Sequence, residues 1–335
     1  MDGKRRSKLK LLYIMDILRK YSDEEHPLPA KKICEKLAEY GISAERKAIY
    51  SDIENLVFYG YDIVKAPPPH AGFFLASREF EIPEIYLLTD AVQSANFISP
   101  KKTRELINRL ESMMSDEQKL LARKNGIYSE YRCKCSNEEV YISIDTLYRA
   151  IQSQKKVTLK YRIRKVDENR NIIVSERIHK VSPYALIWTN DHYYLVCNNE
   201  KYNNLMHLRI DRMSKVKITD ENIRYFGEVC EYKDRFNTED YVSKTFNMFG
   251  GEEREIELSC KNEFLEQVID RFGENLHIIG VENGRFNLRI RGMISDGLIG
   301  WLLQFGGDIE ATAPSELRTA VREKLDILRE KYKKS

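Results

Sequence analysis

Four polar side chains in residues 43–64 would share one face of a helix: Arg46, Lys47, Tyr50 and Ser51. They occupy positions i, i+1, i+4 and i+5, so one turn of helix brings them together. Two cations beside two hydroxyl groups suit contacts to phosphates or to the edges of guanine bases. The same residues would also make an ordinary solvated helix face, and these four positions alone leave that alternative open.

The helix that positions this face is expected to bury its opposite side. Its apolar residues follow the spacing i, i+4, i+7 and i+8, which is one stripe of an amphipathic helix: Ile49, Ile53, Leu56 and Val57. We expect Ser43 to cap the N-terminus, Glu45 to lie in the first turn and Gly60 to end the helix.

Two further helices precede this segment and a hairpin follows it. An amphipathic pattern covers residues 8–21, and a second helix is predicted to turn Ile33, Leu37 and Tyr40 inward and to end at Gly41. Two β-prone runs, residues 61–64 and 72–75, flank a Pro-Pro-Pro tip and predict a hairpin with a rigid loop.

Three short helices followed by a hairpin predict a winged helix-turn-helix over residues 1–80. In that fold the helix after the turn lies in the major groove of DNA, which favours a DNA contact for the polar face over a solvated surface. A basic N-terminal arm, including Arg5 and Arg6, would add sequence-independent attraction to phosphates.

Composition indicates a multidomain protein of the cytoplasm. The chain has 335 residues, more than one ordinary core accommodates, and it has no run of 18 apolar residues that could cross a bilayer. Asp16 and Arg19 interrupt the apolar part of the N-terminus, which argues against a signal peptide. Six scattered cysteines, with one isolated C-x-C at Cys133 and Cys135, predict neither a disulfide framework nor a metal site.

Positive charge is concentrated in the middle of the chain. Residues 141–220 contain 15 lysines and arginines against 8 acidic residues, a net charge of +7. Residues 1–70 contain 13 against 11, a net charge of only +2. Because net charge bears on partners and not on fold, the middle region is where we expect a site for an anionic ligand.

The remaining patterns predict an α+β protein with four parts. A helical linker is expected over residues 81–135 and a small, bent β-sheet domain over residues 136–225. Residues 250–335 alternate as β-α-β-β-α-β, with a hairpin turn at Asn283-Gly284, which is the order of a ferredoxin-like domain.

The sequence resembles the WYL-domain transcriptional regulators of bacteria. "SPYALIWTNDHYYLVCNNE" followed by "LMHLRIDRM" is similar to the core of the WYL domain, with Tyr193-Tyr194-Leu195 in place of Trp-Tyr-Leu and with Arg209-Ile210-Asp211-Arg212 after it. Tyr50-Ser51-Asp52-Ile53 resembles the Tyr-Arg-Asp-Ile of their DNA-binding helix, with serine where arginine is usual. The resemblance extends over most of the chain and implies an accessory C-terminal domain that is packed on, or swapped with, the ligand domain of a partner subunit.

We expect an electropositive ligand site in the WYL-like region. Its arginines would bind an anion while aromatic and histidine side chains stack or donate, and the set is Tyr161, His179, Tyr184, Tyr194, His207, Arg209 and Arg212. The resemblance implies a nucleotide or a single-stranded nucleic acid as the effector. Alternatively, Arg209, Asp211 and Arg212 form a structural cluster of ion pairs.

No sequence motif indicates catalysis or a cofactor. Phosphate-binding loops, nucleophile elbows and H-E-x-x-H are all missing from the sequence, so we expect no enzymatic activity. The prediction is a homodimeric, ligand-responsive transcriptional regulator that binds double-stranded DNA. The alternative is an accessory protein that binds single-stranded nucleic acid without operator specificity. Residues 84–124 and the C-terminal domain both remain candidates for the dimer interface.

Overall fold

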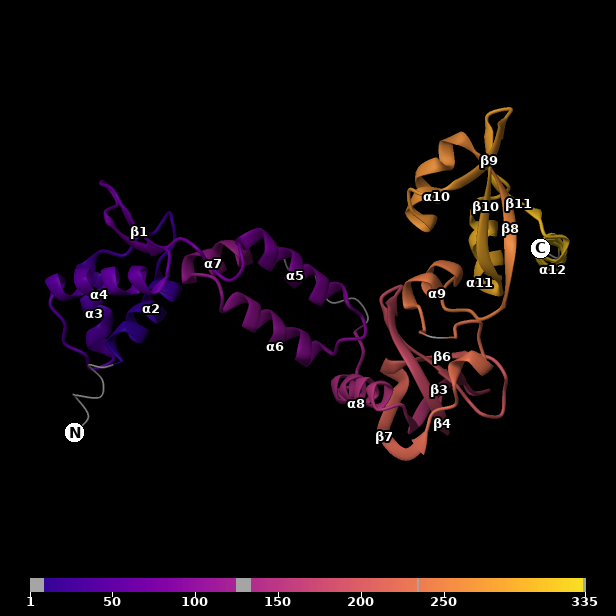
Figure 1. The fold of residues 1–335 in the computed structure, drawn as a ribbon, viewed down its shortest axis with the longest axis horizontal. Helices are drawn as coiled ribbons and strands as arrows, with labels where there is room; N and C mark the ends of the chain where they lie inside the picture. Colours follow the sequence, from indigo (N-terminus) through magenta and orange to yellow (C-terminus); the bar gives the residue numbers. More distant parts are fainter. Residues whose placement is uncertain (1–8, 125–133, 234, 334–335) are drawn as a thin grey trace. The chain divides into compact units, whose positions relative to one another are not determined.

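The computed structural model describes residues 9–124, 134–233 and 235–333, and the chain divides into two compact units, residues 1–138 and 139–335 (Figure 1). Helices and antiparallel sheets occur in both units, so the prediction of an α+β fold is confirmed. Each unit is described by itself.

Three helices and a hairpin make up the first part of the N-terminal unit. The helices are α2 (Lys10–Tyr21), α3 (Ala30–Glu39) and α4 (Arg46–Tyr59), and β1 (Ile63–Ala66) pairs antiparallel with β2 (Gly72–Leu75). Their apolar faces meet in one core, to which every element contributes, including Ile14, Leu18, Ile33, Leu37, Ile49, Ile53, Ile63 and Phe73.

The ends and faces of α4 differ in part from the expectation. Glu45, not Ser43, is the N-cap residue, because its backbone is extended and the helix begins at Arg46. Gly60 ends the helix in the left-handed conformation, as predicted. Val57 is 47% exposed and Tyr40 on the preceding segment is 40% exposed, so neither belongs to the buried stripe to which the spacing assigned it.

A second group of helices follows in the same unit. These are α5 (Ile82–Ser94), α6 (Pro100–Glu111) and α7 (Asp116–Lys124). The Arg78 guanidinium donates to the backbone carbonyls of Arg19, Ser22 and Met113, at 2.9, 2.6 and 3.1 Å. This half-buried side chain therefore connects the end of α2 to the segment after α6.

The C-terminal unit begins with α8 (Val140–Gln152) and a five-stranded antiparallel sheet in the order β6-β5-β4-β3-β7. The strands are β3 (Lys155–Val166), β4 (Ile172–Thr189), β5 (His192–Asn198), β6 (Met206–Arg209) and β7 (Met213–Asn222). The long strand β4 pairs with β3 up to Val181 and with β5 from Ser182 onward.

A short turn separates the last two strands of this sheet. The turn is a 3-10 helix, Ile210–Arg212, between β6 and β7. Ile210 is fully buried at this turn. Asp211 and Arg212 therefore lie in the turn and not on the face of a strand.

The second half of this unit contains α9 (Thr238–Lys244) and a four-stranded antiparallel sheet in the order β11-β8-β10-β9. Along the chain come β8 (Glu252–Lys261), α10 (Leu265–Phe272), β9 (His277–Glu282), β10 (Arg285–Ile294), α11 (Asp296–Gln304), β11 (Ile309–Ala313) and α12 (Ser315–Tyr332). The helices α10, α11 and α12 each contribute to the core on this sheet, through Val268, Leu298 and Leu317 among others.

Two glycines of α11 offer a test of this packing. A Cβ at Gly297 would lie 2.3 Å from the carbonyl oxygen of Phe246, whereas one at Gly300 would meet no heavy atom within 4 Å. We expect Gly297→Ala to lower the free energy of unfolding by about 1–3 kcal/mol, because backbone must move. Gly300→Ala should raise it by roughly 0.5–1 kcal/mol, because alanine favours the helix. Urea denaturation of the full chain measures both, and equal effects would contradict this packing.

Candidate functional site

The polar face of α4 is exposed as one surface. Arg46, Lys47 and Ser51 are exposed, and Tyr50 retains 39% exposure. The Tyr50 ring meets Phe73 of β2 edge-on, with the ring centroids 5.4 Å apart. The structure thus places all four predicted residues on one surface, and Phe73 packs against the ring of Tyr50.

A further cation joins this surface from the hairpin. Lys65 of β1 is exposed, and its Nζ lies 5.4 Å from the centroid of the Tyr50 ring. Sequence reasoning missed Lys65, although its place in the first strand after the helix could have indicated it. Arg5 and Arg6 of the predicted basic arm lie outside the described residues.

In the C-terminal unit, five of the seven predicted ligand residues gather around the end of β6. Tyr194 lies opposite Arg209 in the sheet register, and the Tyr161 hydroxyl accepts a hydrogen bond from the Arg209 amide at 3.3 Å. His179 meets the Tyr161 ring edge-on at 6.0 Å. Burial raises the pKa of Tyr194, while the nearby charges of Arg209 and Arg212 act in the opposite direction.

Arg209 forms a two-pronged ion pair with Asp211. Its Nε and Nη2 donate to the two carboxylate oxygens at 3.0 and 2.7 Å. Burial opposes ionisation of Asp211, but the hydrogen bonds and charge of Arg209 hold its pKa below the ordinary value. For Arg209, the structure therefore shows the ion pair that the sequence left open as an alternative to ligand binding. Arg212 is exposed and makes no ion pair with any residue that the structure describes, so its guanidinium is open to a ligand.

His192 belongs to the same group and was not predicted. Its ring lies edge-on to Tyr194 at 6.2 Å, and its buried Nδ1 has no hydrogen-bond partner among the described residues. Burial lowers the pKa of His192, and the charge of Arg209 lowers it further. A buried polar atom without a partner costs free energy unless a ligand or water satisfies it. Its position at the start of the strand that carries the Tyr-Tyr-Leu triplet was the available signal.

Tyr184 and His207 lie apart from this group. Tyr184 is buried at an irregularity in the β4–β5 register, and its hydroxyl donates to the Arg224 carbonyl at 2.9 Å. His207 Nε2 lies 2.7 Å from the Tyr241 hydroxyl of α9. Both side chains are thus engaged in packing. They were expected at the ligand site because alternation along a strand does not account for bulges or for the elements that cover a face.

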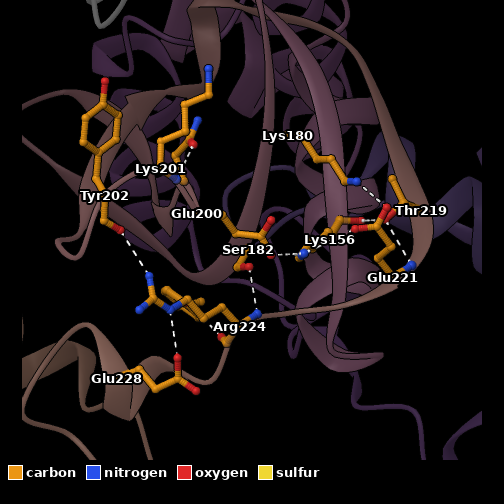
Figure 2. Close-up of polar contacts among 12 residues, drawn as sticks. Lys156, Lys180, Ser182, Glu200, Lys201, Tyr202, Thr219, Glu221, Arg224 and Glu228 are labelled. Atoms are coloured by element: carbon orange, nitrogen blue, oxygen red, sulfur yellow. Dashed lines mark hydrogen bonds and ion pairs between the residues drawn. The ribbon is translucent and has the colours of Figure 1, made fainter.

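Part of the positive charge counted in the sequence is neutralised. Lys156 is buried and forms ion pairs with Glu200 and Glu221, and Lys180 also pairs with Glu221 (Figure 2). Glu221 lies one residue beyond the region that was counted. The hydrogen bonds to Glu200 raise the pKa of Lys156 above its usual value despite burial. The net charge of +7 therefore overstates the cations available to a ligand.

Within residues 9–124, 134–233 and 235–333, no helix is both long and apolar enough to span a membrane. Across the same described parts of the chain, histidine, cysteine, aspartate and glutamate side chains nowhere gather in threes as a metal site would require.

The buried His207 generates a testable pH dependence. Burial lowers its pKa to about 4, so the folded chain keeps it neutral where the unfolded chain, with a pKa near 6.5, takes up a proton. The free energy of unfolding should therefore fall as the pH drops from 6.5 toward 4, by up to about 3 kcal/mol from this group.

Chemical denaturation across this pH range tests the assignment with His207→Gln, which should flatten the decline. His277→Gln, on an exposed position of β9, should leave it as steep as in the wild type. Identical slopes for the wild type and His207→Gln would rule His207 out as the source.

Two known domain families match segments of the C-terminal unit. The WYL domain family matches residues 143–218, which contain most of α8, the strands β3 to β6 and most of β7. The WCX domain family matches residues 252–326, which contain the four-stranded sheet. Among curated proteins, no sequence matches the chain.

Among solved structures, the chain is similar to proteasome accessory factor B/C (PafBC) of Arthrobacter aurescens, with 17% sequence identity and a TM-score of 0.28. The match covers 95% of this chain and 47% of that one, so the chain spans about half the length of that protein. The two domain matches and the Arg-x-Asp-Arg segment at the ion pair agree with the resemblance seen in the sequence. The chain therefore contains a segment that matches the WYL domain family, followed by a segment that matches the WCX domain family.

Proposed function

We propose that this protein is a ligand-responsive transcriptional regulator that binds double-stranded DNA through α4. The observation that carries the proposal is the exposed cationic face of α4, formed by Arg46, Lys47, Tyr50 and Ser51. In this proposal, α2 to α4 with the β1–β2 hairpin are a winged helix-turn-helix, and α4 enters the major groove.

The geometry supports a duplex as the ligand of this face. An α-helix fits the major groove, and Arg46 and Lys47 at the helix N-terminus are the residues that would reach base edges or phosphates. Lys65 lies on the hairpin, so it would reach the neighbouring backbone while α4 lies in the groove. The exposed hydroxyl of Tyr50 adds a donor to phosphate, and that of Ser51 adds a donor to phosphate or to a base edge.

The WYL domain would sense the effector at the group around Arg209. Arg212 offers an open guanidinium, His192 an unsatisfied ring nitrogen, and Tyr161 and Tyr194 offer ring faces and edges. This chemistry fits an anion with a flat base, such as a nucleotide or a single-stranded nucleic acid.

We also infer that the chain acts as a homodimer in the cytoplasm, with the β-α-β-β-α-β domain as a ferredoxin-like accessory domain.

Substitution of the α4 cations tests DNA binding. Against a duplex selected by the wild-type chain from a random pool, Arg46→Ala and Lys47→Ala should each weaken binding about tenfold, by loss of a base or phosphate contact. Lys101→Ala, an exposed lysine on α6, is the matched control and should bind normally. Fluorescence anisotropy at two salt concentrations measures the affinities. Normal affinity for both α4 variants would remove this face from the interface.

Arg212→Ala tests the effector site separately. Binding of labelled single-stranded oligothymidine and of ribonucleoside triphosphates should weaken about tenfold, because one charge-assisted hydrogen bond is lost. Affinity for the selected duplex should stay within twofold of the wild type in the absence of these ligands. The control is Lys201→Ala, an exposed cation elsewhere in the same domain. Unchanged ligand binding in Arg212→Ala, with an intact fold, would reject this site.

A further inference from the structure

Phe58, near the end of α4, is almost completely exposed. Its exposed fraction is 94%, the highest of any large apolar side chain in the described parts of the chain. Val57 and Tyr59 beside it are 47% and 80% exposed, so three consecutive apolar residues face solvent. Such runs are unfavourable on a free surface and are typical of places where a partner covers them.

The rotation of the helix places Phe58 on the polar face. From Lys47, the residues Ser51, Glu54 and Phe58 follow at i+4, i+7 and i+11, which is one stripe of an α-helix. All four residues are exposed. At 1.5 Å per residue, Phe58 lies roughly 16 Å along the axis from Lys47, a distance of about five base pairs.

Glu54 indicates what this stripe faces. A carboxylate between Lys47 and Phe58 would be repelled by the phosphates, whereas it can accept a hydrogen bond from the amino group of cytosine. The stripe is therefore suited to base edges and not to the backbone. The apolar group that the major groove presents is the C5 methyl of thymine.

We propose that Phe58 packs on the methyl group of a thymine at one end of the DNA segment that α4 reads. This inference rests on the proposed function, and it makes Phe58 a specificity-determining residue and not a source of general affinity. Tyr59 has a different role, because its ring stacks on Tyr61 at 5.6 Å and lies off the stripe. That stacking makes Tyr59 the natural control for truncation of an exposed aromatic side chain.

The experiment compares thymine with uracil, which lacks only the methyl group. Wild-type chain, Phe58→Ala and Tyr59→Ala each select duplexes from a random pool, and affinities are then measured for the wild-type duplex with each thymine replaced by deoxyuridine. For the wild type, one replacement should lower affinity about fourfold, the effect of losing one buried methyl-sized group. That position should lie about five base pairs from the base that Lys47 reads.

Phe58→Ala should bind the thymine and uracil duplexes equally and should lose the thymine preference in selection, while Tyr59→Ala should behave like the wild type. Equal sensitivity to uracil in the wild type and Phe58→Ala overturns the inference but leaves duplex binding intact. A change of oligomeric state in Phe58→Ala, seen by sedimentation with no change in DNA preference, assigns the residue to a protein interface instead. Failure of the wild type to retain any duplex overturns the proposed function as well.

Discussion

The packing of Ile49, Ile53 and Leu56 into the N-terminal core fixes the rotation of α4 about its own axis. All three are buried in the cluster that joins the three helices and the hairpin. A helix held by one stripe must present the opposite stripe to solvent, so the position of Lys47, Ser51 and Phe58 follows from the core and not from their own interactions. Rotation of α4 by one residue would replace this surface with an unrelated one.

Charge has different consequences in different parts of the chain. In the WYL domain, several cations are committed to ion pairs, as Lys156 and Lys180 are with glutamates and Arg209 is with Asp211. The cations of the α4 face are simply exposed. A modest net charge in residues 1–70 is therefore compatible with a locally cationic surface, because the position of charges on a face matters more than their sum.

The proposed effector site depends on the junction between β6 and β7. Asp211 lies in the 3-10 turn after β6, where its carboxylate accepts hydrogen bonds from the Arg209 guanidinium, while Arg212 is exposed. The ion pair between Arg209 and Asp211 would then form the floor of a site where an anion contacts Arg212. Of the two alternatives left open by the sequence, the structure shows the ion pair for Arg209, and the ligand contact stays a prediction for Arg212.

The sequence predicted local structure better than it predicted which residues gather at the candidate ligand site. Periodicity and turn residues located the helices, and Gly60 marked the end of α4, because these depend on contacts close in the chain. Tyr184 and His207 were grouped with the site because strand alternation ignores the register irregularity at β4 and the cover supplied by α9. His192 was missed because its significance arises only from neighbours on other strands.

The most direct test of the account is a photo-crosslink from the centre of the α4 face. A photoreactive amino acid at Ser51 of the full chain, irradiated with a duplex that the protein has selected, should form covalent bonds to bases in the major groove. The account predicts crosslinks at defined base pairs in the duplex and none when excess unlabelled selected duplex is added. Retention of the duplex without any crosslink from Ser51, or crosslinks to single-stranded DNA alone, would contradict it.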